Sequence, residues 1–168
     1  VATVMSNLGF FLMGKEQGIH IEQTKVGDRY VLERMLEIGA NLGGEQSGHI
    51  IFLDENTTGD GLLSALHLLQ VVVETGKPLS ELSKIMTVLP QALVGAKVPN
   101  HKKDSYMEYA EIADAIARVS AKFEGEGRVL IRPSGTEPLV RVMIEGKDQA
   151  MIEKEAKELA ELIQNVML

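Results

Sequence analysis

The sequence predicts an α/β domain of residues 1–96 followed by a smaller α+β domain of residues 97–168. In the first part, short apolar runs alternate with amphipathic helical segments, the order typical of α/β proteins. In the second part, two neighbouring strand-like runs lie between two amphipathic helices. Between the parts, residues 96–105 are charged, contain Pro and Asn, and have no periodic apolar face. We therefore expect this segment to be a domain linker.

Each element of the first domain follows from a local pattern. The predicted elements are strand 1–5, helix 6–17, strand 19–24, helix 28–39, strand 49–53, helix 60–75 and helix 79–89. Gly18 and Gly39 are placed to end the first two helices, and Ser6 and Asp28 to cap them. The sixth element has Leu62, Leu63, Leu66, Leu69 and Val73 at helical spacing, which predicts an apolar face.

The second domain is predicted to contain a helix, a hairpin-like pair of strands and a last helix. The first helix has Ile112, Ala115, Ile116, Val119 and Phe123 on one stripe. Strands are predicted over 128–132 and 139–145, and a final amphipathic helix begins near Gln149. In the second strand Val140, Val142 and Ile144 share one face, which predicts that Arg141 lies on the other.

The composition excludes several classes of protein. The chain has 168 residues, of which 45% are hydrophobic, and a formal net charge of −7. This charge argues against a nucleic-acid surface. Without Cys there is no disulfide framework and no thiolate zinc site, which fits a cytoplasmic protein. No apolar run reaches the roughly 18 residues that a membrane span needs. Because the chain starts at Val1 in a strand-like run, we expect it to be a fragment.

The stretch 132–141, "RPSGTEPLVR", has the composition of an anion-binding loop. Ser134 and Thr136 offer hydroxyls, and the N–H groups of residues 134–136 could converge on a phosphate. Gly135 permits close approach or a positive φ. Arg132, and Arg141 from the outer face of the strand, would add guanidinium groups, which suit phosphate geometry.

The alternative is an ordinary turn between two strands. Pro and Gly are common turn residues, and Arg132 and Arg141 could be solvated or paired with Glu137. A carboxylate beside an anion site is unfavourable unless it turns away to pair with an arginine. The residues alone leave both interpretations open.

A second loop, "GGEQSGHI" at residues 43–50, combines groups that suit a sugar. Glu45 offers two strong acceptors, Ser47 a hydroxyl, and His49 a group that titrates near neutrality. The alternative is a Gly-rich connection in which His49 starts a strand. Composition favours neither.

Two short acidic stretches resemble pieces of a metal-binding loop. Gly59-Asp60-Gly61 and Gly27-Asp28-Arg29 each contain one carboxylate, whereas Mg²⁺ sites usually have more oxygen ligands. Helix capping is the better interpretation of both, so we predict no metal ligands in this chain.

Together, "GEQSGH" and "RPSGTEPLVRVMIEG" resemble the α-D-phosphohexomutase family. The stretches "VATVMSNLGF", "VGDRYV", "IIFLDENTTGDGLLSAL" and "TGKPLSEL" are also similar, so that the resemblance covers essentially the whole chain. Family members have four domains. The resemblance implies that residues 1–96 are the later part of domain three, with an incomplete mixed sheet. Residues 97–168 would be domain four, a TATA-binding-protein-like fold with an antiparallel sheet and two helices.

The resemblance also implies an activity. Its details point to interconversion of glucosamine 6-phosphate and glucosamine 1-phosphate, on the route to UDP-N-acetylglucosamine and peptidoglycan. A phosphoserine would donate its phosphoryl group, glucosamine 1,6-bisphosphate would be the intermediate, and an Asp-rich loop would hold Mg²⁺. Neither the serine loop nor the metal loop has a match here. We therefore expect no catalytic residue in this chain and no activity from it alone. A homodimer is compatible with the resemblance.

The family's binding residues transfer by position. The implied sugar-binding residues are Glu45, Ser47 and His49, the last with a proton-handling role, and the neighbouring specificity loop Gly27, Asp28 and Arg29. The implied phosphate-binding residues are Arg132, Ser134, Gly135 and Thr136, assisted by Arg141. Residues 96–105 would be a hinge about which domain four moves to close over the sugar. The alternatives are a phosphomannomutase or phosphoglucomutase, or a non-catalytic phosphosugar-binding module.

Overall fold

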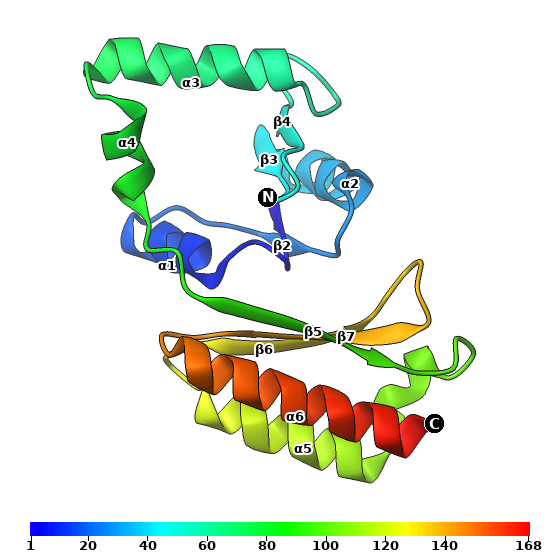
Figure 1. Ribbon diagram of the computed structural model, residues 1–168. Helices are drawn as coiled ribbons and strands as arrows, with labels where there is room; N and C mark the ends of the chain where they lie inside the picture. The colour runs from blue at the N-terminus through cyan, green and yellow to red at the C-terminus, as the bar shows by residue number, and fades with distance from the viewer. The chain divides into compact units, whose positions relative to one another are not determined.

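The computed structural model describes residues 1–168, which divide into two compact units, Val1–Val88 and Leu89–Leu168 (Figure 1). The division falls before the boundary expected between residues 96 and 97. The strand that follows the division pairs within the second unit, and this pairing assigns residues 91–97 to it.

The first unit is built on a four-stranded mixed sheet in the order β2-β1-β3-β4. The strands are β1 (Ala2–Thr3), β2 (Gln23–Thr24), β3 (Leu42–Gly44) and β4 (Ile50–Phe52). β1 is parallel to both β2 and β3, whereas β3 and β4 form an antiparallel pair. Since β2 and β3 both run parallel to β1, the segments that follow them leave the sheet at the same edge. This brings the two loops that begin near Gly27 and Glu45 together.

Two helices of the first unit follow the predicted bounds closely. They are α1 (Leu8–Glu16) and α2 (Asp28–Ile38). The side chain of Asn7, rather than that of Ser6, caps α1 by accepting from the Gly9 N–H at 3.0 Å. Gly27, rather than Asp28, is the N-cap of α2, and Gly39 ends that helix in the left-handed conformation as expected. Val31 and Met35 of α2 form a small core with Ile51.

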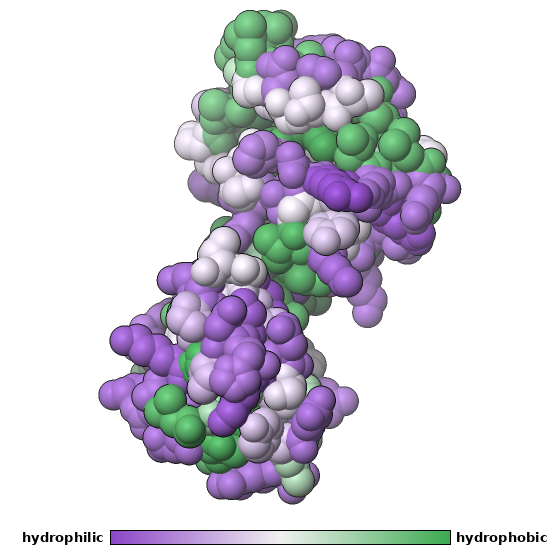
Figure 2. Space-filling view, turned by 90° about the vertical axis from the view of Figure 1, so that its right-hand side faces the viewer, coloured by the Kyte–Doolittle hydropathy of each residue, from purple (hydrophilic) through white to green (hydrophobic).

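The third helix, α3 (Gly61–Thr75), is capped as predicted, and its predicted apolar face is exposed. The Asp60 carboxylate accepts from the N–H groups of Leu62 and Leu63. No residue of α3 is buried, and Leu62 and Val73 are 74% and 81% exposed. α3 reaches the sheet through His67, whose ring stacks on Phe52 of β4, and Figure 2 shows apolar areas on the surface of this unit. The expected helix over 79–89 is shorter, consisting of α4 (Leu79–Leu82) and η1 (Ser83–Ile85).

The second unit is a three-stranded antiparallel sheet with two long helices on one face (Figure 1). Its elements are β5 (Gln91–Lys97), η2 (Lys103–Glu108), α5 (Ala110–Lys122), β6 (Arg128–Pro133), β7 (Leu139–Glu145) and α6 (Gln149–Met167). The central strand β7 pairs with both β5 and β6. Val140, Val142 and Ile144 are completely buried in the core with α5 and α6, so the predicted parity of β7 is confirmed.

The segment 96–105 is not a linker. Ala96 is the sixth residue of β5 and, like Val98, is buried in the core of the second unit. The Val98 N–H donates to the Pro138 carbonyl, and η2 then packs beside the sheet. The sequence did not indicate this arrangement because the inward residues of β5 are mostly small, and the charged residues 102–104 at the start of η2 resemble a solvated segment. A hinge in this segment, as expected from the sequence, would therefore lie inside the second unit and not between the two units.

The sheet of the second unit is tightly packed at Gly127. A Cβ at this position would fall well inside contact distance of the backbone carbonyl oxygen of Glu145, which cannot move alone. We expect Gly127→Ala to lower the free energy of unfolding of the second unit by about 1–3 kcal/mol, as overpacking does. Amide hydrogen exchange of β7 would measure the change. Gly135→Ala is the control, because a Cβ there meets nothing within 4 Å; equal effects of the two variants would contradict the packing argument.

Candidate functional site

The loop 45–49 is the turn of the β3–β4 hairpin. The Glu45 N–H donates to the His49 carbonyl at 2.9 Å, and the Gly48 N–H donates to the Glu45 carbonyl at 3.0 Å. Gly48 has a φ of +98°, a conformation that other residues rarely adopt. Ser47 and His49 are exposed at the turn. The hairpin therefore presents these two side chains to solvent from a fixed backbone.

Three predicted sugar-binding side chains form one hydrogen-bonded chain. The Ser47 hydroxyl donates to Glu45 Oε2 at 3.3 Å and lies 3.2 Å from His49 Nδ1. If the Ser47 hydroxyl donates to Glu45, the neutral His49 tautomer with its hydrogen on Nδ1 can donate to the Ser47 oxygen. Nε2 of the ring is then free to accept a hydrogen bond from a ligand. This arrangement orients polar groups of the kinds that hydrogen-bond sugar hydroxyls.

The second predicted sugar-binding segment is tied to the hairpin. The N–H of Gly27 donates to Glu45 Oε1 at 2.8 Å. Gly27 has a φ of +132°, which turns its peptide group into the start of α2. The structure thus brings Gly27, Glu45, Ser47 and His49 together, as the sequence predicted for residues of one site.

Asp28 and Arg29 are less engaged with this cluster. The Asp28 carboxylate accepts from the N–H of Arg29 at 2.9 Å, within the first turn of α2. The Arg29 side chain is 83% exposed and pairs with Glu33 at 2.7 Å. The hydrogen bond to Glu33 raises the pKa of Arg29, and this group stays charged. Arg29 is free to reach a ligand only by leaving a surface ion pair, which costs little.

The loop between β6 and β7 is closed by its own backbone. Ser134, 2% exposed, donates its N–H to the Leu139 carbonyl at 2.9 Å, and its hydroxyl oxygen accepts from the Glu137 N–H at 3.2 Å. The Ser134 N–H is therefore not available to an anion, contrary to expectation. The N–H groups of Gly135 and Thr136 donate to no group of the protein, and both residues are exposed.

Two arginines face each other across the strands beside this loop. Arg132 and Arg141 are directly paired in the β6–β7 register. The Nε of Arg132 is buried and has no hydrogen-bond partner. Burial, and second the charge of Arg141, lower the pKa of Arg132. Like charges directly opposite on a sheet are destabilising, and an unpaired buried N–H is costly. An anion between the two groups would relieve both.

Glu137 satisfies only one of the two arginines. Its Oε2 accepts from a terminal nitrogen of Arg141 at 2.6 Å, at a partly exposed site. The predicted pairing of Glu137 with an arginine is confirmed for Arg141 and not found for Arg132. The loop therefore keeps one uncompensated guanidinium beside two unused backbone N–H groups.

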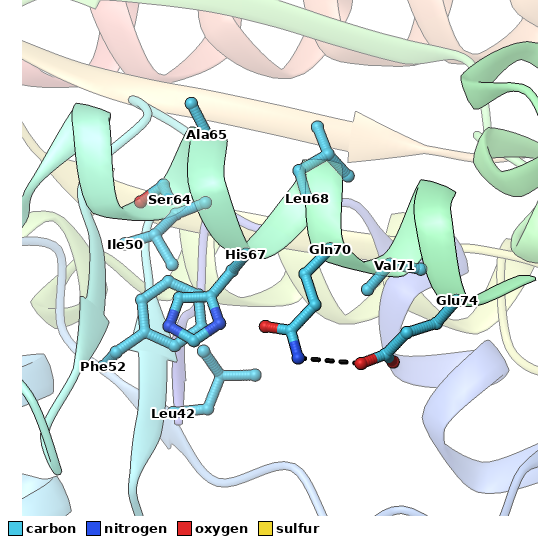
Figure 3. A pocket seen from close by; sticks show the side chains of 10 residues that line it. All are labelled: Leu42, Ile50, Phe52, Ser64, Ala65, His67, Leu68, Gln70, Val71 and Glu74. Carbon is cyan, nitrogen blue, oxygen red and sulfur yellow. Dashed lines mark hydrogen bonds between the residues drawn. The ribbon is translucent and has the colours of Figure 1, made fainter.

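A pocket of the first unit lies away from these loops. It is an open groove of about 630 Å³ between α3 and β4, lined mainly by apolar side chains. Figure 3 shows the His67 ring lying over Phe52, with ring centres 4.0 Å apart, and the Gln70 amide donating to Glu74. None of the predicted site residues lines this groove. Its apolar walls do not suit a phosphosugar.

The structure contains neither a metal-binding cluster nor a membrane-spanning helix. No group of three or more His, Asp or Glu side chains could hold a metal ion. The residues present therefore do not fit a magnesium site. No helix is both long enough and apolar enough to cross a membrane.

One residue beside the anion loop was missed by the sequence analysis. The Lys103 ammonium donates to the Ser134 carbonyl at 2.6 Å. Its positive charge is the only sign of this role in the sequence, and it lies in the segment that was predicted to be a domain linker.

The fold and the two loops define a class: an α/β unit with a polar hairpin turn, followed by an α+β unit with an arginine-lined loop. Comparison with protein families matches residues 1–89 to "Phosphoglucomutase/phosphomannomutase, alpha/beta/alpha domain III". Residues 68–162 match "Phosphoglucomutase/phosphomannomutase, C-terminal domain". The chain belongs to the phosphoglucomutase/phosphomannomutase family, which confirms the predicted family and the fold of both parts.

Individual proteins agree with this assignment. The chain is 62% identical to a phosphoglucosamine mutase of Ruminiclostridium cellulolyticum over 98% of its own length and 36% of that protein. An Aspergillus fumigatus N-acetylphosphoglucosamine mutase in complex with glucose 1,6-bisphosphate superposes with a TM-score of 0.82 at 18% identity, over 99% of this chain and 38% of that one. The same fungal enzyme with GlcNAc-6P and magnesium gives a TM-score of 0.77 at 19% identity, over 100% and 39%. The chain thus spans little more than a third of these relatives.

The bond between Gly27 and Glu45 can be tested directly. We expect Glu45→Ala to release the Gly27 N–H and to speed its hydrogen exchange roughly tenfold, because a bond to a charged acceptor is lost. Amide exchange followed by NMR measures this. Glu33→Ala, which removes the exposed partner of Arg29, should leave Gly27 unchanged. Unaltered exchange of Gly27 in the Glu45 variant would show that the two loops are independent.

Proposed function

We propose that this chain supplies the sugar-binding and phosphate-binding loops of an enzyme that interconverts glucosamine 6-phosphate and glucosamine 1-phosphate. The observation that carries the proposal is the Arg132–Arg141 pair, with the buried Nε of Arg132 left unpaired. Planar guanidinium groups and free backbone N–H groups suit a phosphate monoester. The similarity to phosphoglucosamine mutases favours the amino sugar among the family's substrates.

In this proposal each loop has one role. Arg132, the hydroxyls of Ser134 and Thr136, and the N–H groups of Gly135 and Thr136 hold the phosphate that is not reacting, and Arg141 assists. Glu45, Ser47 and His49 bind sugar hydroxyls, and Gly27, Asp28 and Arg29 form the neighbouring specificity loop. A bisphosphate that binds in two orientations needs one phosphate site for whichever end is idle. It also needs hydroxyl contacts that tolerate both orientations.

The remaining chemistry is assigned to the rest of a longer polypeptide. We propose that a phosphoserine there exchanges its phosphoryl group with glucosamine 1,6-bisphosphate. Mg²⁺ would be bound there too, because no cluster in this chain fits it. On this proposal the enzyme is cytoplasmic, serves UDP-N-acetylglucosamine and peptidoglycan synthesis, binds no nucleic acid, and is compatible with a homodimer. The 168-residue chain alone is inactive.

The activity is tested with the full-length polypeptide encoded by the gene. Purified enzyme would be assayed with glucosamine 6-phosphate, glucose 6-phosphate and mannose 6-phosphate. We expect the highest kcat/KM for the glucosamine phosphate. A higher value for one of the other two sugars would reassign the chain to a phosphoglucomutase or phosphomannomutase. A start codon immediately upstream of Val1 would instead support a non-catalytic binding module.

Arg132→Ala tests the phosphate loop. We expect phosphosugar binding to weaken by about 1.5–3 kcal/mol, because a charge-assisted contact is lost. Binding of glucosamine 6-phosphate to the 168-residue protein can be followed from the amide shifts of Gly135 and Thr136. Arg118→Ala removes an exposed arginine from α5 of the same unit and should have no effect. Equal affinities of the two variants would remove Arg132 from the site.

Glu137→Gln tests whether the carboxylate competes with the ligand. Glu137 occupies Arg141 when no anion is bound, so its neutralisation should tighten phosphosugar binding by roughly two- to fivefold, the range of an exposed ion pair. The control is Glu126→Gln, which neutralises an exposed carboxylate paired with Lys147 at 3.5 Å in the same unit. Weaker binding of the Glu137 variant would mean that this residue orients Arg141 for the ligand.

A further inference from the structure

The segment η2 holds the backbone on both sides of Arg132. The Lys103 ammonium donates to the Ser134 carbonyl at 2.6 Å, and the Tyr106 hydroxyl donates to the Ile131 carbonyl at 3.1 Å. These two carbonyls flank the Arg132-Pro133 dipeptide in the sequence. Both donors lie in the 3₁₀ segment Lys103–Glu108 and both bonds are partly buried.

We propose that Lys103 and Tyr106 are positioning residues for the phosphate loop: they fix the peptide groups from which the loop's anion donors project. This inference rests on the proposed function of the loop. It assigns to η2 a role in setting the affinity for the phosphate, although neither side chain needs to touch it.

The planar peptide bond explains how Lys103 acts at a distance. The carbonyl of Ser134 and the N–H of Gly135 belong to one trans peptide group and point in opposite directions. When Lys103 holds the carbonyl, the Gly135 N–H is directed to the other side, where it has no partner in the protein. Without this bond the peptide could rotate and turn a carbonyl oxygen, which repels anions, toward the ligand.

Tyr106 acts in the same way one peptide group before Arg132. Its bond to the Ile131 carbonyl fixes the peptide that leads into Arg132, two residues before the end of β6. Pro133 adds no N–H there to hold the strand. Burial raises the pKa of Tyr106, so its hydroxyl keeps the proton that it donates.

The test compares two adjacent lysines in the 168-residue protein. Lys103→Met and Lys102→Met each remove one positive charge and keep most of the side-chain stem. Lys102 donates to the Met167 carbonyl at 3.3 Å, away from the loop. Inorganic phosphate is titrated while the amide shifts of Gly135 and Thr136 are followed. We expect affinity to fall roughly five- to thirtyfold in the Lys103 variant and less than twofold in the Lys102 variant.

Two further variants separate positioning from a general structural effect. Lys103→Arg keeps a charged donor and should restore most of the affinity, whereas Tyr106→Phe should weaken binding roughly two- to fivefold. Amide exchange of β7 should be the same in all four variants, which shows that the unit remains folded. Faster exchange of β7 in the Lys103 and Tyr106 variants, in proportion to their loss of affinity, would overturn the proposal in favour of a structural role.

The outcomes also distinguish this inference from the proposed function. If the unaltered protein binds phosphate at Gly135 and Thr136 but Lys103→Met binds it as well as Lys102→Met does, the positioning role is wrong and the phosphate site stands. If phosphate does not shift these amides in the unaltered protein, the phosphate site itself is wrong.

Discussion

The opposition of two guanidinium groups across β6 and β7 is the constraint on which the proposed phosphate loop depends. Arg132 and Arg141 are held face to face by the register of the strands, and that register is fixed by the other face of the sheet. Val140 and Val142 are completely buried against the helices. A slip of one residue would move Arg141 into the core and these valines out of it. The hydrophobic core therefore maintains an electrostatic arrangement that the strands alone would not adopt.

The loop compensates this repulsion only in part. Glu137 pairs with Arg141, while the Nε of Arg132 remains buried without a partner. If carboxylates of the protein paired with both arginines, neither guanidinium would be left to bind an anion. If neither arginine were paired, the repulsion between them would destabilise the loop in the absence of a ligand. A single carboxylate in a partly exposed ion pair gives an intermediate state, in which an anion could replace it at Arg141 without unfolding the turn. Such exchange is compatible with the proposed function, in which either phosphate of a sugar bisphosphate occupies the site.

The sequence predicted the parts of this architecture that rest on local patterns. The sequence predicted the bounds of β7, its alternation and the glycine that ends α2. A strand has a side-chain period of two, and a residue with positive φ is usually glycine, so both features can be recognised in a sequence. Strand β5 was not predicted, since its inward residues include two alanines and its other face carries Gly95 and Lys97. The apolar period of α3 was predicted correctly, but such a period does not say what covers the apolar face, and no residue of α3 is buried in this unit. A bond from a lysine to a distant carbonyl, as at Lys103, has no sequence signature at all.

The glycines of the two loops separate requirements of the fold from those of a ligand. Gly27 and Gly48 have positive φ, and a side chain at Gly43 would come within 2.7 Å of Val31, so the protein itself explains all three. Gly135 differs: its φ is not positive and a Cβ there would meet nothing within 4 Å. Neither backbone strain nor packing requires a glycine at that position. Close approach of an anion to the backbone, as in the proposed phosphate site, is a reason for a glycine at such a position. The residue that the fold leaves unexplained thus lies in the loop that follows Arg132 and contains the two unpaired N–H groups.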